Sequence, residues 1–425
     1  MITFVVVLFV ALVLIGMPIA FILGVIPMAF WLVTGGSIPS IIFPQKMFSG
    51  ISNFVLMAIP FFILAGNLMN SGGVTRRIID FTQSIVGWVR GGLGVVNVVA
   101  SMIFGGISGS ANADVAAFGT ALIPAMEESG YDKEFSTAIT VTSSTVGPII
   151  PPSISMVVYA SLANVSVGAL FLGGVIPGFL IGLFLTILVL IVAHIKHYPK
   201  DSAFSIRKVF SSFAHAIPAL IMPLIILGGV LMGVCTPTEA AAIAVVYAFV
   251  VGLFVFRELT LESIGKILLD TLTLSAAIFM VIAFTNVVSY IIADIRIPQL
   301  LGDFLTSVSG DNKYIILLLI NIILLCMGAL LDPSAGLILL TPILVPIAQR
   351  LGIDLVHLGV IMVLNLTIGL TTPPVGTCLY IGSTISGLPV PRLFKAMLPY
   401  LISNIIVLLI VTYVPETVIF LAALV

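Results

Sequence analysis

Residues 143–153 read Ser-Ser-Thr-Val-Gly-Pro-Ile-Ile-Pro-Pro-Ser, and residues 365–377 read Asn-Leu-Thr-Ile-Gly-Leu-Thr-Thr-Pro-Pro-Val-Gly-Thr. Both stretches belong to a longer internal match, in which residues 106–152 align with residues 328–374 at a constant offset of 222 and without a gap. The shared positions are mostly Gly, Pro and Asp, so common hydrophobicity does not explain the match. Two apolar halves that carry the same helix-breaking residues predict a duplicated transporter with a site where the halves meet.

The composition is that of a membrane protein. Hydrophobic residues make up 60% of the 425 residues and charged residues 8%, whereas a soluble domain carries roughly 25% charged residues. The apolar runs 2–33, 170–192 and 216–256 exceed the roughly 20 residues that cross a bilayer. The first run lacks a basic leading segment and continues past Pro18, so we interpret it as mature structure and not as a signal peptide. We therefore expect an all-α polytopic protein in a lipid bilayer.

Several classes of function are not expected, because the sequence contains no cluster of basic, Cys or His residues. The net charge is −1 and no basic cluster is present, so nucleic acid is not an expected partner. Cys235, Cys326 and Cys378 are scattered through apolar segments, and the four histidines are equally dispersed. This spacing favours neither a disulfide framework nor a metal centre of Cys and His. Because no histidine lies near the many hydroxyls in sequence, we do not expect an enzyme.

The distribution of Lys and Arg predicts the topology, since loops rich in these residues favour the cytoplasmic side. The basic loops are 196–208, 76–90, 257–266 and 392–395. Placing all of them on one side requires two re-entrant hairpins that enter from opposite faces, with turns at Gly105–Asn112 and Gly328–Gly336. An odd number of crossings separates the hairpins, so the halves are expected to be inverted repeats. Both chain termini then lie on the outer, periplasmic side.

These expectations divide the chain into two repeats and a linker. The first inverted repeat covers residues 1–196, with scaffold helices in 1–72, a hairpin at about 92–126 and a broken helix at about 135–163. A cytoplasmic linker follows at 197–215. The second repeat covers residues 216–425, with scaffold helices in 216–295, a hairpin at about 313–349 and a broken helix at about 357–386. We expect an outer loop at 297–312, an interfacial amphipathic helix at 259–269 and its counterpart at 37–50.

The chemistry is expected in four segments that place polar and helix-breaking residues at the midpoint of apolar stretches: 105–114, 143–153, 328–336 and 365–377. Pro frees a backbone carbonyl, and Gly permits an unwound conformation. Freed backbone at membrane depth is tolerated only when it is buried in protein or lines a cavity. Unwound carbonyls with Ser, Thr and Asn oxygens suit Na⁺, and helix N-termini suit a carboxylate.

Individual residues in these segments also have structural interpretations. A lone Gly or Pro in a membrane helix usually marks only a kink. Here the expected hairpin tip and the expected broken helix recur together in both halves at identical spacing. The small residues 105–113 also fit a tight helix-packing face. Asp332 fits a helix N-cap as well as an ion site, and Asp114 could stabilise the start of the returning half-helix. Glu239 fits the first turn of a helix. Arg296 fits an interfacial anchor or local ion pair, and alternatively a counter-charge for an anionic substrate.

At this point the chain resembles the large membrane subunit of tripartite ATP-independent periplasmic (TRAP) transporters over essentially its whole length. The resemblance is most specific at Gly105–Asp114, Gly147–Ser153 with its Gly-Pro-x-x-Pro-Pro pattern, Gly328–Ser334 and Gly369–Thr377. It implies an elevator transporter of the bacterial inner membrane, in which a transport domain moves against a scaffold domain. The implied activity is Na⁺-driven uptake of an organic acid of the sialic acid or C4-dicarboxylate type. The implied partners are a small four-helix membrane subunit and a periplasmic substrate-binding protein.

The resemblance also implies binding residues for at least two Na⁺ ions and one carboxylate substrate. The first ion is implied at Ser108, Ser110 or Asn112 with Gly147, Ile150 and Pro152, and the second at Gly328, Asp332 and Ser334 with Gly369, Thr372 and Pro374. The substrate carboxylate is implied between the hairpin tips near Ser153, Ser155 and Thr377, with Asn112, Asp114 and Arg296 as further candidates. The 222 offset pairs Ser110 with Asp332 and Asn112 with Ser334, so the two ion sites are expected to differ.

Two other functions remain open from the sequence. One is a stand-alone Na⁺/dicarboxylate symporter of related architecture that needs no binding protein. The other is a channel or a structural membrane scaffold.

Overall fold

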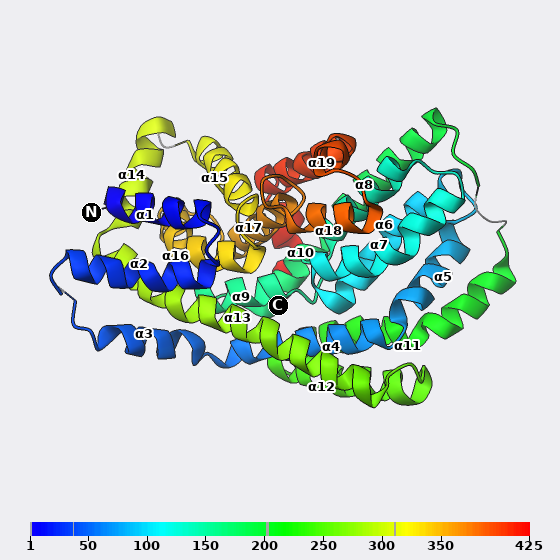
Figure 1. Cartoon of the computed structure of the whole chain (residues 1–425), viewed down its shortest axis with the longest axis horizontal. Coiled ribbons are helices and arrows are strands. Elements are labelled where there is room, and N and C mark those ends of the chain that lie inside the picture. Colours follow the sequence, from blue (N-terminus) through cyan, green and yellow to red (C-terminus); the bar gives the residue numbers. More distant parts are fainter. Residues whose placement is uncertain (1, 37, 201–203, 310–311) are drawn as a thin grey trace.

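The structure, a computed structural model, describes residues 2–36, 38–200, 204–309 and 312–425, which form helices joined by turns (Figure 1). The helices of the first half are α1 (Ile2–Leu14), α2 (Ile19–Val33), α3 (Ile42–Ile51), η1 (Phe54–Met57), α4 (Ala58–Ser71), α5 (Val74–Val86), α6 (Gly92–Ser108), α7 (Ala111–Glu128), α8 (Lys133–Ser143), η2 (Ser144–Val146), α9 (Ile154–Ala163) and α10 (Val167–Ile195). Those of the second half are α11 (Ile206–Leu231), α12 (Pro237–Val250), η3 (Val251–Val255), α13 (Leu261–Asp294), α14 (Ile297–Ser309), α15 (Lys313–Gly328), α16 (Pro333–Arg350), α17 (Leu355–Gly369), α18 (Thr377–Ser386), α19 (Val390–Tyr413) and α20 (Glu416–Ala422).

The chain is a multi-pass membrane protein by the length and composition of its helices. Among the described residues, seven helical segments are long and apolar enough to cross a membrane: Phe54–Ser71, Val167–Ile195, Ile206–Leu231, Pro237–Val255, Leu261–Asp294, Pro333–Arg350 and Val390–Tyr413. Several shorter apolar helices, among them α6, α15 and α17, accompany them. The all-α polytopic fold expected from the composition is confirmed.

Two helical hairpins occupy the segments where the sequence predicts them. In the first, α6 and α7 are separated by Gly109 and Ser110, and Gly109 has φ 58°. A Cβ added at Gly109 would lie 2.8 Å from the carbonyl oxygen of Pro152, so glycine is required for both conformation and space. In the second, α15 and α16 are separated by residues 329–332. Figure 1 shows the hairpins on opposite sides of the molecule, with their turns directed toward its middle.

The helix bounds of the second half follow those of the first at the offset seen in the sequence. Helix α7 covers 111–128 and α16 covers 333–350, which is a shift of 222 at both ends. The correspondence extends beyond the matched sequence, because α14 begins and ends within one residue of the position that α5 predicts for it. Each half also contains an interrupted helix, with residues 147–153 unwound between η2 and α9 and residues 370–376 between α17 and α18.

Buried polar contacts hold each hairpin against the interrupted helix of its own half. The hydroxyls of Ser101 on α6 and Ser143 on α8 lie 3.1 Å apart. In the second half, Nδ2 of Asn365 on α17 donates to Oδ1 of Asn321 on α15 at 2.8 Å. Ser143 and Asn365 are related by the 222 offset. The two halves therefore join the same two elements, the first hairpin helix and the interrupted helix, through different side chains.

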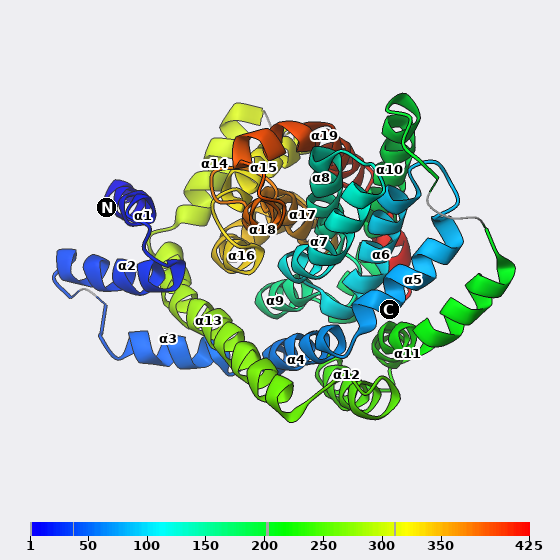
Figure 2. The same ribbon diagram turned by 45° about the vertical axis from the view of Figure 1, so that its right-hand side comes forward.

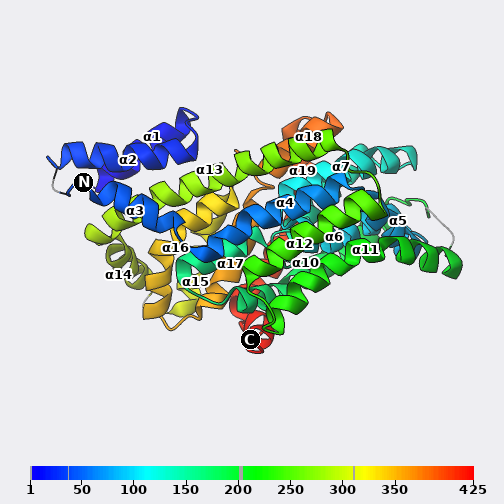
Figure 3. The ribbon, with the colours of Figure 1, turned by 90° about the horizontal axis from the view of Figure 1, so that it is seen from below.

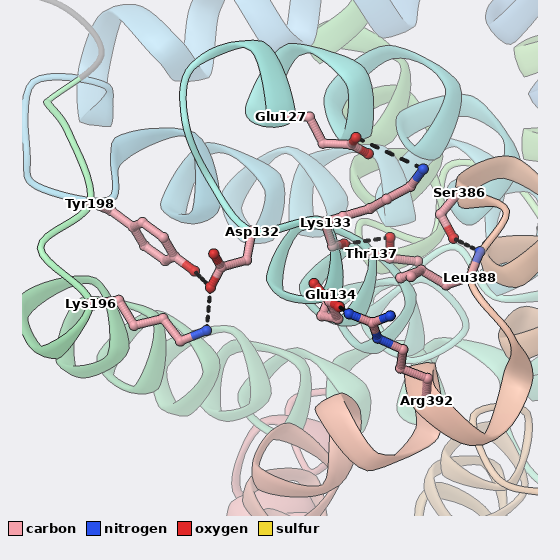
Figure 4. Close-up of polar contacts among 10 residues, drawn as sticks. All are labelled: Glu127, Asp132, Lys133, Glu134, Thr137, Lys196, Tyr198, Ser386, Leu388 and Arg392. Atoms are coloured by element: carbon pink, nitrogen blue, oxygen red, sulfur yellow. Dashed lines mark hydrogen bonds and ion pairs between the residues drawn. The ribbon is translucent and has the colours of Figure 1, made fainter.

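The four basic loops gather at one end of the molecule. Nη1 of Arg77 lies 2.7 Å from Oε1 of Glu258, which joins the 76–90 and 257–266 loops. The backbones of Arg90 and Lys200 form an isolated bridge. Lys196 pairs with Asp132 and Arg392 with Glu134, so the α7–α8 turn joins the remaining loops (Figure 4). We call this surface the basic face, defined by Arg77, Arg90, Lys196, Lys200 and Arg392.

An outer arc of helices surrounds the hairpins and interrupted helices. Figure 2 shows α2, α3, α13, α4, α12 and α11 following one another around this inner group. Helix α13 packs on α2, α3, α4 and α16, and α12 packs on α4 and α11. Figure 3 shows α13, α4 and α12 crossing the same side of the molecule, and the C-terminus at one edge. The arc therefore forms one wall of the space between the hairpin tips.

Three segments differ from the sequence-based prediction. Helix α11 begins at Ile206, so the second part of the expected linker 197–215 is helical; Arg207 and Lys208 are good helix formers and can extend their charged ends to water. The expected interfacial helix at 259–269 is instead the first part of α13, because residues 270–276 contain neither Gly nor Pro. The expected outer loop at 297–312 contains the helix α14. Glu239 completes a capping box with Thr236 at the start of α12, as its first-turn position predicts.

Candidate substrate and ion site

A cavity of about 410 Å³ lies between the turns of the two hairpins. It is bounded by the α6–α7 turn, the unwound residues beside α9 and α18, the α15–α16 turn and one side of α13. Its lining residues are Gly109, Ser110, Ala111, Asn112, Ala113, Pro148, Ile154, Ser155, Leu274, Ile278, Asp332, Pro333, Ser334 and Leu370. The structure thus brings Ser110, Asn112, Ser155, Asp332 and Ser334 of the predicted site residues to one cavity.

The N-termini of three helices border this cavity. Ser110 accepts the Ala113 N–H at 3.4 Å and caps α7, and Asp332 accepts the Ser334 N–H at 3.1 Å and caps α16. Ser153 accepts the Met156 N–H at 3.2 Å and caps α9. Each N-terminus carries the positive end of a helix dipole, which favours an anion. The ends of α7 and α9 have uncharged Ser caps and suit a carboxylate, whereas the end of α16 already carries the carboxylate of Asp332.

Asn112 connects the first hairpin to the interrupted helix of the second half. Its Oδ1 accepts the Thr377 hydroxyl at 2.8 Å and the Cys378 thiol at 3.2 Å. Thr377 is the first residue of α18, so this contact crosses the boundary between the two halves. Asn112 and Thr377, both predicted site residues, therefore lie together at the edge of the cavity.

The first predicted ion segment lies where the α6–α7 turn packs on the unwound residues 147–153. A Cβ added at Gly105 would lie 2.8 Å from Cα of Gly147, and one added at Gly147 would lie 3.6 Å from the carbonyl oxygen of Ser110. Ser108 is buried at the same place, and Ile150 and Pro152 follow in the unwound segment. The packing-face interpretation of residues 105–113 is confirmed, and the same close approach presents backbone carbonyls and hydroxyls to one another.

The second predicted ion segment has a similar arrangement, in which Gly369 is the offset counterpart of Gly147 and Gly328 is that of Gly106. A Cβ added at Gly328 would lie 3.2 Å from Cα of Gly369, and the Val375 N–H donates to the Ala329 carbonyl at 3.1 Å. The Thr372 hydroxyl donates to the Gly369 carbonyl at 2.8 Å, and Pro374 follows within the same unwound segment. The groups that meet here are backbone and hydroxyl oxygens, which are the ligands that a hard monovalent cation such as Na⁺ prefers.

Among the predicted substrate residues, Thr377 lies at the edge of the cavity and three others lie apart from its lining. Asp114, in the first turn of α7, is fully buried and its Oδ1 accepts the Ser101 hydroxyl at 3.0 Å. Ser153 is fully buried and its hydroxyl donates to the Pro148 carbonyl. Arg296 is exposed at the turn between α13 and α14. Asp332 caps α16, which confirms its N-cap interpretation, and it lines the cavity; its role in an ion site stays a prediction.

Sequence reasoning missed the contribution of α13. Leu274 and Ile278 form one wall of the cavity, and they lie one helical turn apart on the same face. Both are ordinary apolar residues of a membrane helix, so nothing in their type or spacing distinguishes them. Cys378 was also unmarked, because its contact with Asn112 joins residues far apart in the chain.

Comparison with known proteins gives similarity along nearly the whole chain. Residues 6–417 match the family described as "Tripartite ATP-independent periplasmic transporter, DctM component". The chain is 44% identical to the C4-dicarboxylate TRAP transporter large permease protein DctM of Pseudomonas aeruginosa, over 87% of this chain and 86% of that protein. It is 41% identical to the sialic acid TRAP transporter large permease protein SiaM of Vibrio cholerae, over 94% and 93%. It is 39% identical to the isethionate TRAP transporter permease protein DctMQ of Oleidesulfovibrio alaskensis, over 96% of this chain and 64% of that protein.

Two solved structures share the fold at low sequence identity. The YdaH transporter of Alcanivorax borkumensis superposes with a TM-score of 0.61 at 14% identity, over 86% of each chain. The MtrF efflux pump of Neisseria gonorrhoeae superposes with a TM-score of 0.62 at 13% identity, over 90% of this chain and 85% of that one. At these identities the likeness concerns the fold alone.

Proposed function

Because the chain belongs to the DctM component family of tripartite ATP-independent periplasmic transporters, we propose that it is the permease subunit for Na⁺-driven uptake of an organic acid. The substrate class is a C4-dicarboxylate or a sialic acid, as in the names of the DctM and SiaM relatives. The observation that carries this proposal is the cavity between the hairpin turns, where the N-termini of α7, α9 and α16 converge. The uncharged Ser caps of α7 and α9 favour a carboxylate at their ends of the cavity, and the Asp332 carboxylate at the end of α16 favours a cation beside it.

Sodium coupling is supported by the two places where a hairpin turn packs on unwound backbone. The first offers oxygens near Ser108, Ser110 and Gly147, and the second offers oxygens near Gly328, Gly369 and Thr372. Sodium bound at either place would draw the hairpin turn toward the interrupted helix. The cavity would then form around the anion only after the cation is bound, which couples the two solutes.

The transport mechanism that this fold supports is an elevator. The hairpins and interrupted helices would move as one transport domain against a scaffold made from the outer arc. The partners are a small membrane subunit and a periplasmic binding protein that delivers the substrate; the DctMQ relative extends well beyond the part that this chain matches. The basic face would be cytoplasmic in the inner membrane. The C-terminus would be periplasmic, because Val425 packs beside Gly168 and Val230, away from the basic loops.

Uptake by reconstituted vesicles tests the proposal. Radiolabelled succinate and sialic acid are supplied outside proteoliposomes that contain this chain with its small subunit and binding protein. An inward Na⁺ gradient should drive saturable accumulation of one of the two acids. Equal accumulation by the chain alone would instead support a stand-alone symporter. A flux that neither saturates nor depends on the gradient would support a channel and contradict the proposal.

A further inference from the structure

Three adjacent spaces, each sharing lining residues with the next, lie in a row from the cavity between the hairpin turns toward the loops of the basic face. The cavity shares Ser110, Ala113, Ile154 and Leu274 with a small space of about 80 Å³ beside α4. That space shares Asn70 with a wide cleft of about 750 Å³ between α5 and α7. The lining of the cleft includes Glu128 and Ser129, next to the α7–α8 turn whose Asp132 pairs with Lys196 of the basic face.

The walls of this cleft suit a small polar solute. The wall from α4 and α5 carries Asn70, Thr75, Arg76 and Gln83. The wall from α7 consists mainly of Ala and Thr side chains, which leave the space open. Arg76 is exposed and forms no ion pair within the described part of the chain, whereas the adjacent Arg77 pairs with Glu258 and stacks at 3.8 Å on Phe256. Arg77 therefore has a structural role, whereas the side chain of Arg76 is available to bind a solute.

In the second half, an ion pair bridges the corresponding pair of helices. Helices α14 and α16, which correspond to α5 and α7, pack directly on each other. Nη1 of Arg350 lies 2.8 Å from Oδ1 of Asp303 and bridges them. Arg350 is the counterpart of Glu128 at the 222 offset. The described residues therefore show a cleft beside the first hairpin and an ion pair at the corresponding place beside the second.

We propose that the α5–α7 cleft is the route by which the anionic substrate passes between the cavity and the basic face, and that Arg76 is the cationic side chain that attracts the carboxylate into it. The direction of passage, from the cavity to the cytoplasm, rests on the proposed function. The charge selectivity of the cleft does not rest on it. Glu128 lies on the opposing wall and repels an anion. Arg76 and Glu128 together therefore set the electrostatic potential along the cleft.

A thiol-modification assay on the purified whole chain tests this route without any transport measurement. The reporter is Thr120→Cys on the α7 wall, in a background of Cys235→Ser and Cys326→Ser; Cys378 is retained because it is fully buried. The probes are an anionic sulfonate-bearing methanethiosulfonate and an uncharged one of similar size. At low ionic strength, Arg76→Ala should slow the anionic reagent by about three- to tenfold, because one screened charge in a cleft alters the local anion concentration on this scale.

Matched variants separate charge from structure. Arg76→Lys should keep the fast anionic rate, Glu128→Gln should raise that rate, and Lys395→Ala, outside the cleft, should leave it unchanged. The uncharged reagent should react equally in all of them, which shows that the cleft keeps its shape. An anionic rate that is unchanged in Arg76→Ala would overturn the proposal. It would also be overturned if Thr120→Cys stays unmodified while Lys395→Cys reacts.

An uptake arm distinguishes failure of this inference from failure of the proposed function. In the vesicle assay, Arg76→Ala should lower the maximal rate several-fold and leave the half-saturating substrate concentration within about twofold, since Arg76 lies outside the cavity. If labelling is charge-selective but the chain shows no Na⁺-driven uptake, the proposed function is refuted and the α5–α7 route is supported. If uptake is normal but labelling is not charge-selective, the route is refuted and the proposed function is supported.

Discussion

Ser110 and Asn112 are the residues whose removal should most directly alter sodium dependence. Ser110→Ala and Asn112→Ala each remove an oxygen from the first predicted ion segment, so the half-saturating Na⁺ concentration should rise by about fivefold, equivalent to roughly 1 kcal/mol per lost contact. Neither variant should abolish membrane insertion. The measurement is succinate or sialic acid uptake against Na⁺ concentration. Thr142→Ala serves as the control, because that hydroxyl donates to Ala138 within its own helix. Unchanged sodium dependence in both variants would refute the site assignment.

Gly369 should tolerate no side chain. A Cβ at this position would collide with the backbone of Gly328, so Gly369→Ala must push the second hairpin away from the interrupted helix. Overpacking of this kind costs about 1–3 kcal/mol, and we expect a lower melting temperature in detergent together with loss of transport. Gly265→Ala is the matched control, because a Cβ there meets nothing within 4 Å and α13 should gain helix propensity. Equal melting temperatures for the two variants would show that Gly369 and Gly328 approach each other less closely than in this structure.

The sequence predicted the residues of the cavity unevenly, for a physical reason. Polar and helix-breaking residues stand out in an apolar helix, because each needs a local structural reason. Four residues found in this way, Ser110, Asn112, Asp332 and Ser334, line the cavity. Ser153 has the same local signature, but its hydroxyl is used for capping and by the Pro148 carbonyl. Leu274 and Ile278 bear no mark, because their role depends on which helix faces them across the cavity. Residue type alone carries no information about that partner.

At the level of elements, the α7–α8 turn is fastened to the end of α10 through one carboxylate. Asp132 accepts the Tyr198 hydroxyl at 2.7 Å and pairs with Lys196 (Figure 4). The bond from Lys196 and then that from Tyr198 lower the pKa of Asp132 below its usual value. Burial, and after it the bond to Asp132, raises the pKa of Tyr198. A lowered pKa in the folded chain means that the contact stabilises at pH values above the unfolded pKa of about 3.9.

The pH dependence of this contact follows from that sign. Asp132→Asn should lower stability at pH 7 and at pH 5 by about 0.5 kcal/mol, since half-exposed ion pairs are screened by solvent. The difference should shrink as the pH falls through the folded pKa, where the native carboxylate is protonated too. Melting temperatures of both proteins across this range provide the measurement, with Asp80→Asn as an exposed control. A difference that persists unchanged at the acid end would assign the effect to packing of the turn and not to charge.

Element boundaries were predictable where capping and breaker residues define them. Helix α16 begins where Asp332 caps it, as the sequence predicts, and α7 begins where Ser110 caps it. The start of α11 and the continuity of α13 were not predictable, because both depend on charged residues that extend to water from a helix that continues into the membrane. Arg207, Glu262 and Lys266 look like loop or interfacial residues when their neighbours in space are unknown.

At the scale of the whole molecule, a buried hydrogen bond joins the two halves beside the interrupted helix. Nδ2 of Asn404 on α19 donates to Oγ1 of Thr145 at 3.0 Å, and both residues are fully buried. Thr145→Val should leave the amide without this partner and cost about 0.6–2 kcal/mol. Thr367→Val is the control at the offset position, where the hydroxyl donates to Val363 of its own helix. Thermal unfolding should separate the two variants; equal losses would show that the contact between halves contributes nothing beyond the helix itself.

The large-scale arrangement was the most predictable level, because charge and repetition constrain it together. Loops far apart in the chain lie on one face, as the distribution of Lys and Arg predicts. The cleft between α5 and α7 was not predictable, and at the corresponding place in the second half Asp303 and Arg350 form an ion pair. A duplicated sequence specifies two similar halves, and it does not specify how the space beside each hairpin is filled.

The length of α13 links the cavity to the thickness of the surrounding lipid. The helix has 34 residues, about 51 Å at 1.5 Å per residue, whereas the hydrocarbon core of a bilayer is about 30 Å thick. Its stretch without charges, 271–293, lies between Asp270 and Asp294, and its cavity wall at Leu274 and Ile278 belongs to that stretch. A thinner bilayer must tilt this helix further. Shortening the acyl chains of the reconstituted lipid should therefore change the affinity for the organic acid at constant Na⁺, so that the membrane itself acts as an effector of the transporter.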